Sequence, residues 1–253
     1  VSAGSATLRK AASLARIAET GVSASNGIAI TGGGEVGLED GVAIAADIAW
    51  SGRALGTDAA GRVTVDGDWP VLTVHNELTL PFPATVDGEL RFENAPRFDL
   101  AIEWQNLFIP GVARLLSPAG ELEVAGAIDD YRFSGSGMLD IDGRAASFVG
   151  AGRGEAGLLT IESLALDALA AGAPAGTLRA TGTLSLDERG AELAVEAQDF
   201  DPGWVQGAWP GRLSGTSTLR TEFAPTFFAR FDALDLDGEL LGRTVAIRGA
   251  AEV

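Results

Sequence analysis

Residues 200–215, with the sequence FDPGWVQGAWPGRLSG, separate two runs in which apolar and polar residues alternate. The run before them covers residues 191–197, and the run after them covers residues 212–220. Alternation with a period of two places the two kinds of side chain on opposite faces of a β-strand. Pro202 and Pro210 interrupt the ladder because proline lacks the backbone N–H that a central strand donates. The stretch therefore predicts a loop between two strands that each have one apolar face.

The same pattern occurs earlier in the chain. Residues 98–104 alternate in the same way, and Leu100 matches Leu193 at an offset of 93 residues. The segment LDIDG at 139–143 matches LDLDG at 234–238 at an offset of 95 residues. A repeat of this length that carries strands favours an elongated array over a closed globule.

Alternating segments continue through the rest of the chain and are separated by Gly, Asp and Pro. Residues 7–19 could be drawn as an amphipathic helix, but the internal repeat aligns part of this segment with a strand-like stretch, so we predict a strand there. A change of parity near Glu162 predicts a β-bulge. Helix is expected only as one or two turns at 111–116 and 203–206, directly after prolines.

The predicted fold class is all-β with little helix, and the predicted organisation is a single elongated β unit over residues 1–253, with approximate repeats at 27–143 and 176–253. One apolar face on nearly every strand suits a two-layer sandwich, and it equally suits an open sheet folded over a groove. The apolar parity also carries many small residues, which fill a core poorly and leave room for a ligand or for a sharp bend. These small residues are Ala46, Gly88, Gly126, Gly135, Gly137, Ala180, Gly182 and Gly215.

The larger residues of the apolar parity are the candidate lining of such a groove. Parity places them on one continuous apolar surface. They are Leu72, Val74, Leu90, Phe92, Leu100, Ile102, Trp104, Leu122, Val124, Phe133, Leu193 and Val195.

Composition excludes several classes of function. The net charge of −17 argues against nucleic acid and against an anionic membrane surface as partners, because both need a basic face. The absence of cysteine excludes disulfides and thiolate metal sites. His75 is the only histidine, and its place on the polar parity of a strand favours a solvated side chain over a catalytic triad or a zinc site.

No run approaches the ~20 apolar residues of a membrane span, and the start lacks the form of a signal peptide. The chain opens and closes within the strand pattern, so we expect an internal fragment of a longer protein.

No motif for catalysis, metal binding or a cofactor is recognisable. Residues 32–34 are three glycines without the Lys-Ser/Thr of a phosphate loop, and they predict a turn or a bend. The DIDG and DLDG segments resemble parts of calcium loops, but Ala151 and Ala246 stand where the loop needs glutamate. We expect strand ends that turn at Gly143 and Gly238, and we predict no enzyme activity, no metal site and no cofactor.

Several short motifs resemble, in their order and spacing, the TamB family of the translocation and assembly module, which belongs to the AsmA-like group of bridge-like lipid carriers. The resemblance runs over most of the chain, from about residue 27 onward. The motifs are Trp50, Leu78-Thr79-Leu80-Pro81, Trp104-Gln105-Asn106-Leu107, Phe200-Asp201-Pro202, Trp209-Pro210-Gly211-Arg212-Leu213-Ser214-Gly215 and Gly238-Glu239-Leu240-Leu241-Gly242-Arg243.

The resemblance implies a long, β-rich protein of the periplasm that is anchored in the inner membrane. It implies a strongly bent, taco-like sheet with an apolar interior groove. It also implies phospholipid acyl chains as cargo, and an outer-membrane barrel as a partner that another region of the full-length protein contacts.

Two functions follow as hypotheses. In the first, the chain is a lipid-conduit segment that carries phospholipid between the inner and outer membranes. In the second, it is a scaffold or chaperone segment that offers sheet edges to unfolded outer-membrane proteins by β-augmentation.

Overall fold

The computed structural model describes residues 8–11, 14–23, 29–38, 41–54, 57–93, 95–108, 115–141, 143–170, 173–185, 190–204, 207–222 and 228–252. The chain divides into two compact units. The first unit contains residues 1–113 and 121–128, and the second unit contains residues 114–120 and 129–253. Strand β9 (Leu115–Ala127) contributes to both units.

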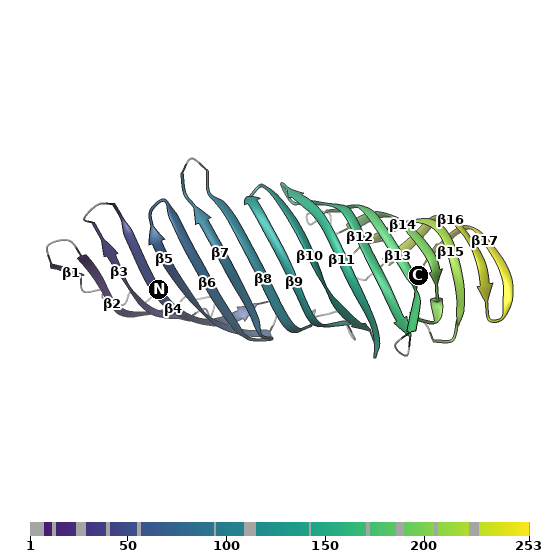
Figure 1. The fold of residues 1–253 in the computed structure, drawn as a ribbon, viewed down its shortest axis with the longest axis horizontal. Helices are drawn as coiled ribbons and strands as arrows, with labels where there is room; N and C mark the ends of the chain where they lie inside the picture. The colour runs from purple at the N-terminus through teal and green to yellow at the C-terminus, as the bar shows by residue number, and fades with distance from the viewer. Residues whose placement is uncertain are drawn as a thin grey trace. The chain divides into compact units, whose positions relative to one another are not determined.

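The first unit is an antiparallel sheet whose strands pair in chain order (Figure 1). The alternation of apolar and polar residues explains why these segments are strands, because each strand can then turn its apolar face to one side. The strands are β1 (Leu8–Ala11), β2 (Leu14–Ser23), β3 (Ala29–Gly37), β4 (Ala43–Ala54), β5 (Thr57–Asp68), β6 (Val71–Leu80), β7 (Ala84–Arg91) and β8 (Arg97–Phe108).

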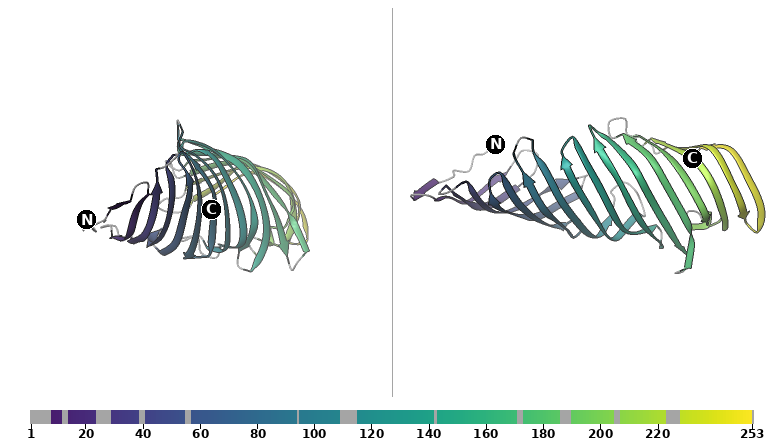
Figure 2. Two further views of the ribbon diagram at one scale, coloured as in Figure 1. Left: turned by 60° about the vertical axis from the view of Figure 1, so that its left-hand side comes forward. Right: turned by 45° about the horizontal axis from the view of Figure 1, so that its top comes forward.

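The second unit repeats this arrangement, and its strands again pair antiparallel in chain order. Figure 2 shows the succession of strands from two further directions. One short 3₁₀ turn, η1 (Pro202–Trp204), follows β14. The strands are β10 (Asp130–Ile141), β11 (Arg144–Glu155), β12 (Leu158–Ala170), β13 (Ala173–Ser185), β14 (Gly190–Phe200), β15 (Gly211–Glu222), β16 (Phe228–Leu240) and β17 (Arg243–Glu252).

Burial follows the strand alternation in both units. In β8 and β14, half-buried residues alternate with exposed ones along most of the strand. No large side chain of the described residues is fully buried, whereas a two-layer sandwich would enclose several of them. Each unit is therefore an open sheet, and the prediction of an elongated all-β fold with little helix is confirmed.

Local predictions from the sequence had mixed outcomes. The segment predicted as strand near the N-terminus forms β1 and β2. The predicted bulge is also present, because the register of β11 with β12 skips Glu162. Of the two helical turns, the one after Pro202 exists as η1, although residues 205 and 206 lie outside the described residues. The other is wrong where it can be examined, since Leu115 and Leu116 belong to β9 and residues 111–114 are not described.

Two glycine predictions are also wrong. Residues 32–34 lie inside β3 and do not form a turn. A methyl group on Gly32 would lie 2.8 Å from the Cα of Ile48, so glycine is needed here for close approach of two strands. Gly143 does form the predicted turn, with a φ of 79°. Gly238 does not, because β16 continues to Leu240.

Candidate functional site: an apolar sheet face

The strand register of the first unit gathers apolar side chains on one face of the sheet. Val65 lies opposite Val74 across β5 and β6, and Leu72 lies opposite Leu90 across β6 and β7. Residues that face each other across neighbouring strands share one side of the sheet. We define the apolar face of the first unit by the positions that this register connects, which are 44, 46, 48 and 50 of β4, 61, 63, 65 and 67 of β5, 72, 74, 76 and 78 of β6, 84, 86, 88 and 90 of β7, and 98, 100, 102 and 104 of β8.

Nine of the twelve predicted groove residues belong to the first unit, and Phe133, Leu193 and Val195 belong to the second. Leu72 is buried, and the other eleven are half-buried. The neighbours Asp99 and Glu103 on the opposite face are exposed, as their parity requires. The structure therefore places the predicted residues on the half-buried side of their strands within each unit.

Phe92 differs from the other candidates because it lies just beyond the end of β7. Its backbone N–H donates to Pro70 O at 2.8 Å, and its ring stacks on Trp69 with the centroids 4.9 Å apart. Trp69 is 49% exposed. Phe92 therefore lies at the strand-end rim of the apolar face, where it packs on an exposed indole.

Several glycines of these faces lie beneath a large side chain from the next strand. A methyl group on Gly61 would lie 2.9 Å from Trp50 Cζ2, and one on Gly137 would lie 2.8 Å from Phe148 Cε1. Leu100 covers Gly88 in the same way. The sequence predicts that such small residues leave room for a ligand or allow a sharp bend. At Gly88 and Gly137 a neighbouring side chain occupies the space, so these two glycines leave no room for a ligand.

The sequence interpretation missed one polar residue on the apolar face. Asn76 lies between Val63 of β5 and Val86 of β7 in the register. Its Oδ1 accepts a hydrogen bond of 3.1 Å from the indole Nε1 of Trp50. The alternation Leu72, Val74, Asn76, Leu78 was the available signal, since it puts Asn76 on the apolar parity.

The sequence also did not show where the side chains of the loop after β14 pack. Trp204 is only 4% exposed and clusters with Phe200, Ala146, Ala168 and Ala175. Its Nε1 donates to Ala145 O at 3.0 Å, about sixty positions earlier in the chain. The segment therefore ties the end of β14 to the start of β11 within the second unit.

Asp201 organises this loop. Its Oδ1 accepts hydrogen bonds of 2.8 Å from the backbone N–H groups of Gly203 and Gly211. Arg144 Nη1 donates to Trp204 O at 2.9 Å. These contacts explain why the FDPGW sequence folds back onto the sheet.

The opposite face of the first unit is charged. Arg62 donates to both carboxylate oxygens of Asp47, and this hydrogen bonding lowers the pKa of Asp47 and raises that of Arg62. His75 Nδ1 lies 2.5 Å from Asp87 Oδ1, and its Nε2 lies 3.4 Å from Glu77 Oε1. The hydrogen bond to Asp87 is the main cause that raises the pKa of His75, and the hydrogen bond to Glu77 adds to it. Exposed ion pairs of this kind contribute little to stability.

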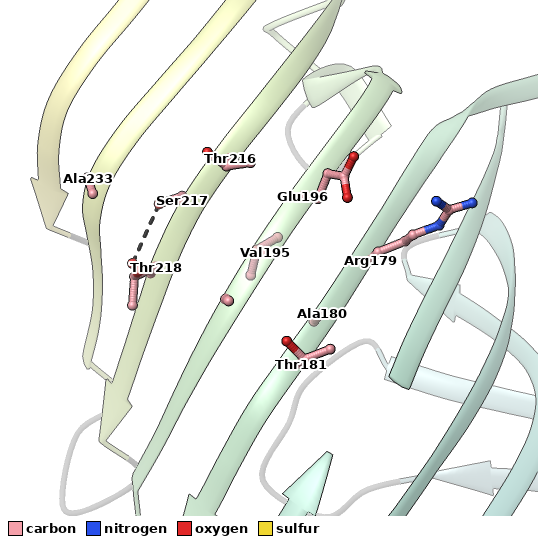
Figure 3. Close-up of a pocket in the computed structure, with 10 residues that line it drawn as sticks. Arg179, Ala180, Thr181, Val195, Glu196, Thr216, Ser217, Thr218 and Ala233 are labelled. Atoms are coloured by element: carbon pink, nitrogen blue, oxygen red, sulfur yellow. Dashed lines mark hydrogen bonds between the residues drawn. The ribbon is translucent and has the colours of Figure 1, made fainter. Parts of the chain in front are cut away.

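A hollow of about 370 Å³ lies on the polar face of the second unit, over β13 to β16. Figure 3 shows Arg179 and Glu196 on neighbouring strands, together with the hydroxyl-bearing Thr181, Thr216 and Thr218. Arg179 and Glu196 are exposed. Most of its lining residues lie on the parity opposite Leu193, although Val195, one of the predicted groove residues, also lines it.

The described residues contain no group of three or more side chains placed to hold a metal ion. No helix in this part of the chain has the length and apolar character needed to cross a membrane.

Comparison with known proteins identifies the family. The family model described as the TamB N-terminal domain matches residues 23–253, which are 231 of the 253 residues. A comparison with curated proteins gives no match, and a comparison with solved structures gives none either. TamB proteins serve transport and assembly and are not enzymes; they span the periplasm, are anchored to a membrane and associate with outer-membrane partners. The match extends over most of the sequence, and the chain therefore belongs to the TamB family.

Proposed function

We propose that this chain is a segment of a lipid conduit, in which phospholipid acyl chains lie along the apolar face and head groups stay in water. The apolar face is the observation that carries the proposal. Apart from the buried Leu72, its large side chains are only half-buried, although the strands that bear them have a neighbouring strand on both sides. In a packed core such residues would be fully buried.

An acyl chain suits this surface energetically. Burial of each CH₂ group contributes about 0.8 kcal/mol, so half of a sixteen-carbon tail gains several kcal/mol. The candidate contacts are the twelve predicted groove residues, Leu72, Val74, Leu90, Phe92, Leu100, Ile102, Trp104, Leu122, Val124, Phe133, Leu193 and Val195.

Family membership supports the wider setting of the proposal. In this setting the full-length protein lies in the periplasm, is anchored in the inner membrane and carries phospholipid between the inner and outer membranes. The barrel partner of the outer membrane would bind another region of the full-length protein.

Site-specific photo-crosslinking in the full-length protein tests the conduit. A photoreactive residue at position 100 or 102 should give lipid adducts, while the same residue at position 99 or 103 on the exposed face should give few. Equal adducts from both faces, or none at all four positions, would overturn the proposal. Adducts to unfolded outer-membrane proteins in place of lipid would point to the scaffold function.

A further inference from the structure

Asn76 is the one polar residue among the connected positions of the apolar face from β4 to β8. Its neighbours along β6 are Val74 and Leu78, and its cross-strand neighbours are Val63 and Val86. The side chain is half-buried. An amide in such surroundings costs free energy unless each of its polar atoms finds a partner.

The orientation of the Asn76 amide is fixed by chemistry. The indole N–H of Trp50 can only donate, so the atom that it contacts at 3.1 Å must be the amide oxygen. The amide nitrogen consequently points elsewhere, and it has no hydrogen-bond partner among the described residues. Asn76 thus offers a donor with a defined direction on an otherwise apolar surface.

Gly61 makes this contact possible. Trp50 lies on β4 and Asn76 on β6, and Gly61 is the residue of β5 opposite Trp50. Trp50 lies over Gly61, where a methyl group would be 2.9 Å from Cζ2 and 3.0 Å from Cε2. The glycine leaves the space that the indole needs to cross β5.

We propose that Asn76 is a binding subsite for the ester carbonyl of an acyl lipid, an inference that rests on the lipid-conduit function above. A hydrocarbon tail has no acceptor for the Asn76 N–H₂. The ester carbonyl at the root of the tail is the acceptor that a diacyl phospholipid carries closest to its apolar part. A lipid whose ester carbonyl accepts this hydrogen bond leaves its tail free to lie along the valines and leucines around Asn76.

Competition between two lipids tests the subsite. The purified chain is offered diacyl and dialkyl phosphatidylcholine of equal chain length, and bound lipid is counted by native mass spectrometry. The dialkyl lipid lacks the carbonyl, so we expect a preference of about two- to tenfold for the diacyl lipid, which corresponds to one net hydrogen bond.

Two variants assign that preference to the amide. Asn76→Leu should bind the dialkyl lipid as well as the unchanged chain does and should lose the preference. Trp50→Phe keeps a ring over Gly61 but loses the N–H that orients the amide, so its preference should fall. His75→Gln on the opposite face of the same strand is the matched control and should keep the preference, and circular dichroism confirms that each variant is folded.

The outcomes separate the subsite from the conduit. Lipid binding without any diacyl preference, or a preference that survives Asn76→Leu, would overturn the subsite and leave the conduit standing. Failure of the unchanged chain to bind either lipid would overturn the conduit itself.

Discussion

Individual glycines on the apolar face are constrained by the neighbouring strand more than by their own conformation. A methyl group on Gly61 would lie 2.6 Å from Glu77 O and 2.9 Å from the Trp50 ring. Backbone atoms cannot move away as a flexible side chain could, so Gly61→Ala should destabilise the first unit by about 1–3 kcal/mol. Chemical denaturation measures this change.

Gly37→Ala is the control for that substitution. A methyl group on Gly37 would meet only the Cβ of Ala43 at 3.5 Å, which is an ordinary contact. Its effect should stay within about 1 kcal/mol of zero, since alanine also restricts the unfolded chain. Equal losses for the two variants would show that close approach is not the reason for glycine at position 61.

His75 provides a second test at this scale, because it is the only histidine and its NMR signals are therefore assigned without ambiguity. Its hydrogen bonds to Asp87 and Glu77 raise its pKa above the ordinary value of about 6.5. A raised pKa means that the folded state holds the proton more tightly. The stabilisation is therefore complete below the unfolded pKa and is lost as the pH rises through the folded pKa.

An NMR titration of the His75 ring should accordingly give a pKa above that of a model peptide. Asp87→Asn should lower it, and Glu77→Gln should lower it less, because Asp87 is the closer partner. A titration at the model-peptide value in the unchanged chain would contradict the contacts around His75.

At the scale of elements, the loop between β14 and β15 holds two tryptophans in opposite environments. Trp204 is 4% exposed and packs against the sheet, whereas Trp209 is 56% exposed. Trp204→Ala should cost about 3–5 kcal/mol in unfolding free energy because it empties a packed site. Trp209→Ala should change stability by less than about 1 kcal/mol. Similar losses for both would mean that Trp204 does not anchor the loop.

Element boundaries show how far the sequence could predict this fold. The period-two pattern located the strands, and the parity change at Glu162 located a bulge, because both depend on which face a side chain takes. This pattern could not predict whether Gly238 lies in a turn or in a strand. It matches Gly143 in the sequence, but its backbone lies against Arg212 and Leu213 of the neighbouring strand and continues in β16. At Gly238, pairing with the neighbouring strand β15 determines that the backbone continues as a strand.

For the candidate site too, the sequence predicted what depends on parity and missed what depends on contacts between strands. Parity alone put the twelve groove candidates on the half-buried side of their strands. The bond from Trp50 to Asn76 could not be predicted, since it joins residues two strands apart and depends on Gly61 between them. The predicted single unit with its two repeats, and the role of the twelve residues in lipid binding, stay predictions.

At the scale of the whole molecule, the proposed conduit predicts that a single charge placed on the apolar face blocks function. Leu100→Asp should abolish the function of the full-length protein while the chain still folds. An open face with half-buried side chains can hydrate a carboxylate, but a carboxylate beside a lipid tail is costly and interrupts the path. Complementation of an outer-membrane permeability defect would measure function, and protease resistance would measure folding.

Asp99→Ala on the exposed face is the matched control and should complement fully. A Leu100→Asp protein that is degraded in cells would instead indicate a closed core at this position. Full complementation by Leu100→Asp would contradict a lipid path over β8.

The pairing of strands in chain order also has a consequence for how each unit forms. From β1 to β8 and from β10 to β17, each described register joins strands that are consecutive along the chain. Loops that are closed between consecutive strands are short and cost little entropy, and local contacts favour rapid folding. A chain that is delivered end first can thus add one hairpin at a time to a growing sheet, before its last residues arrive.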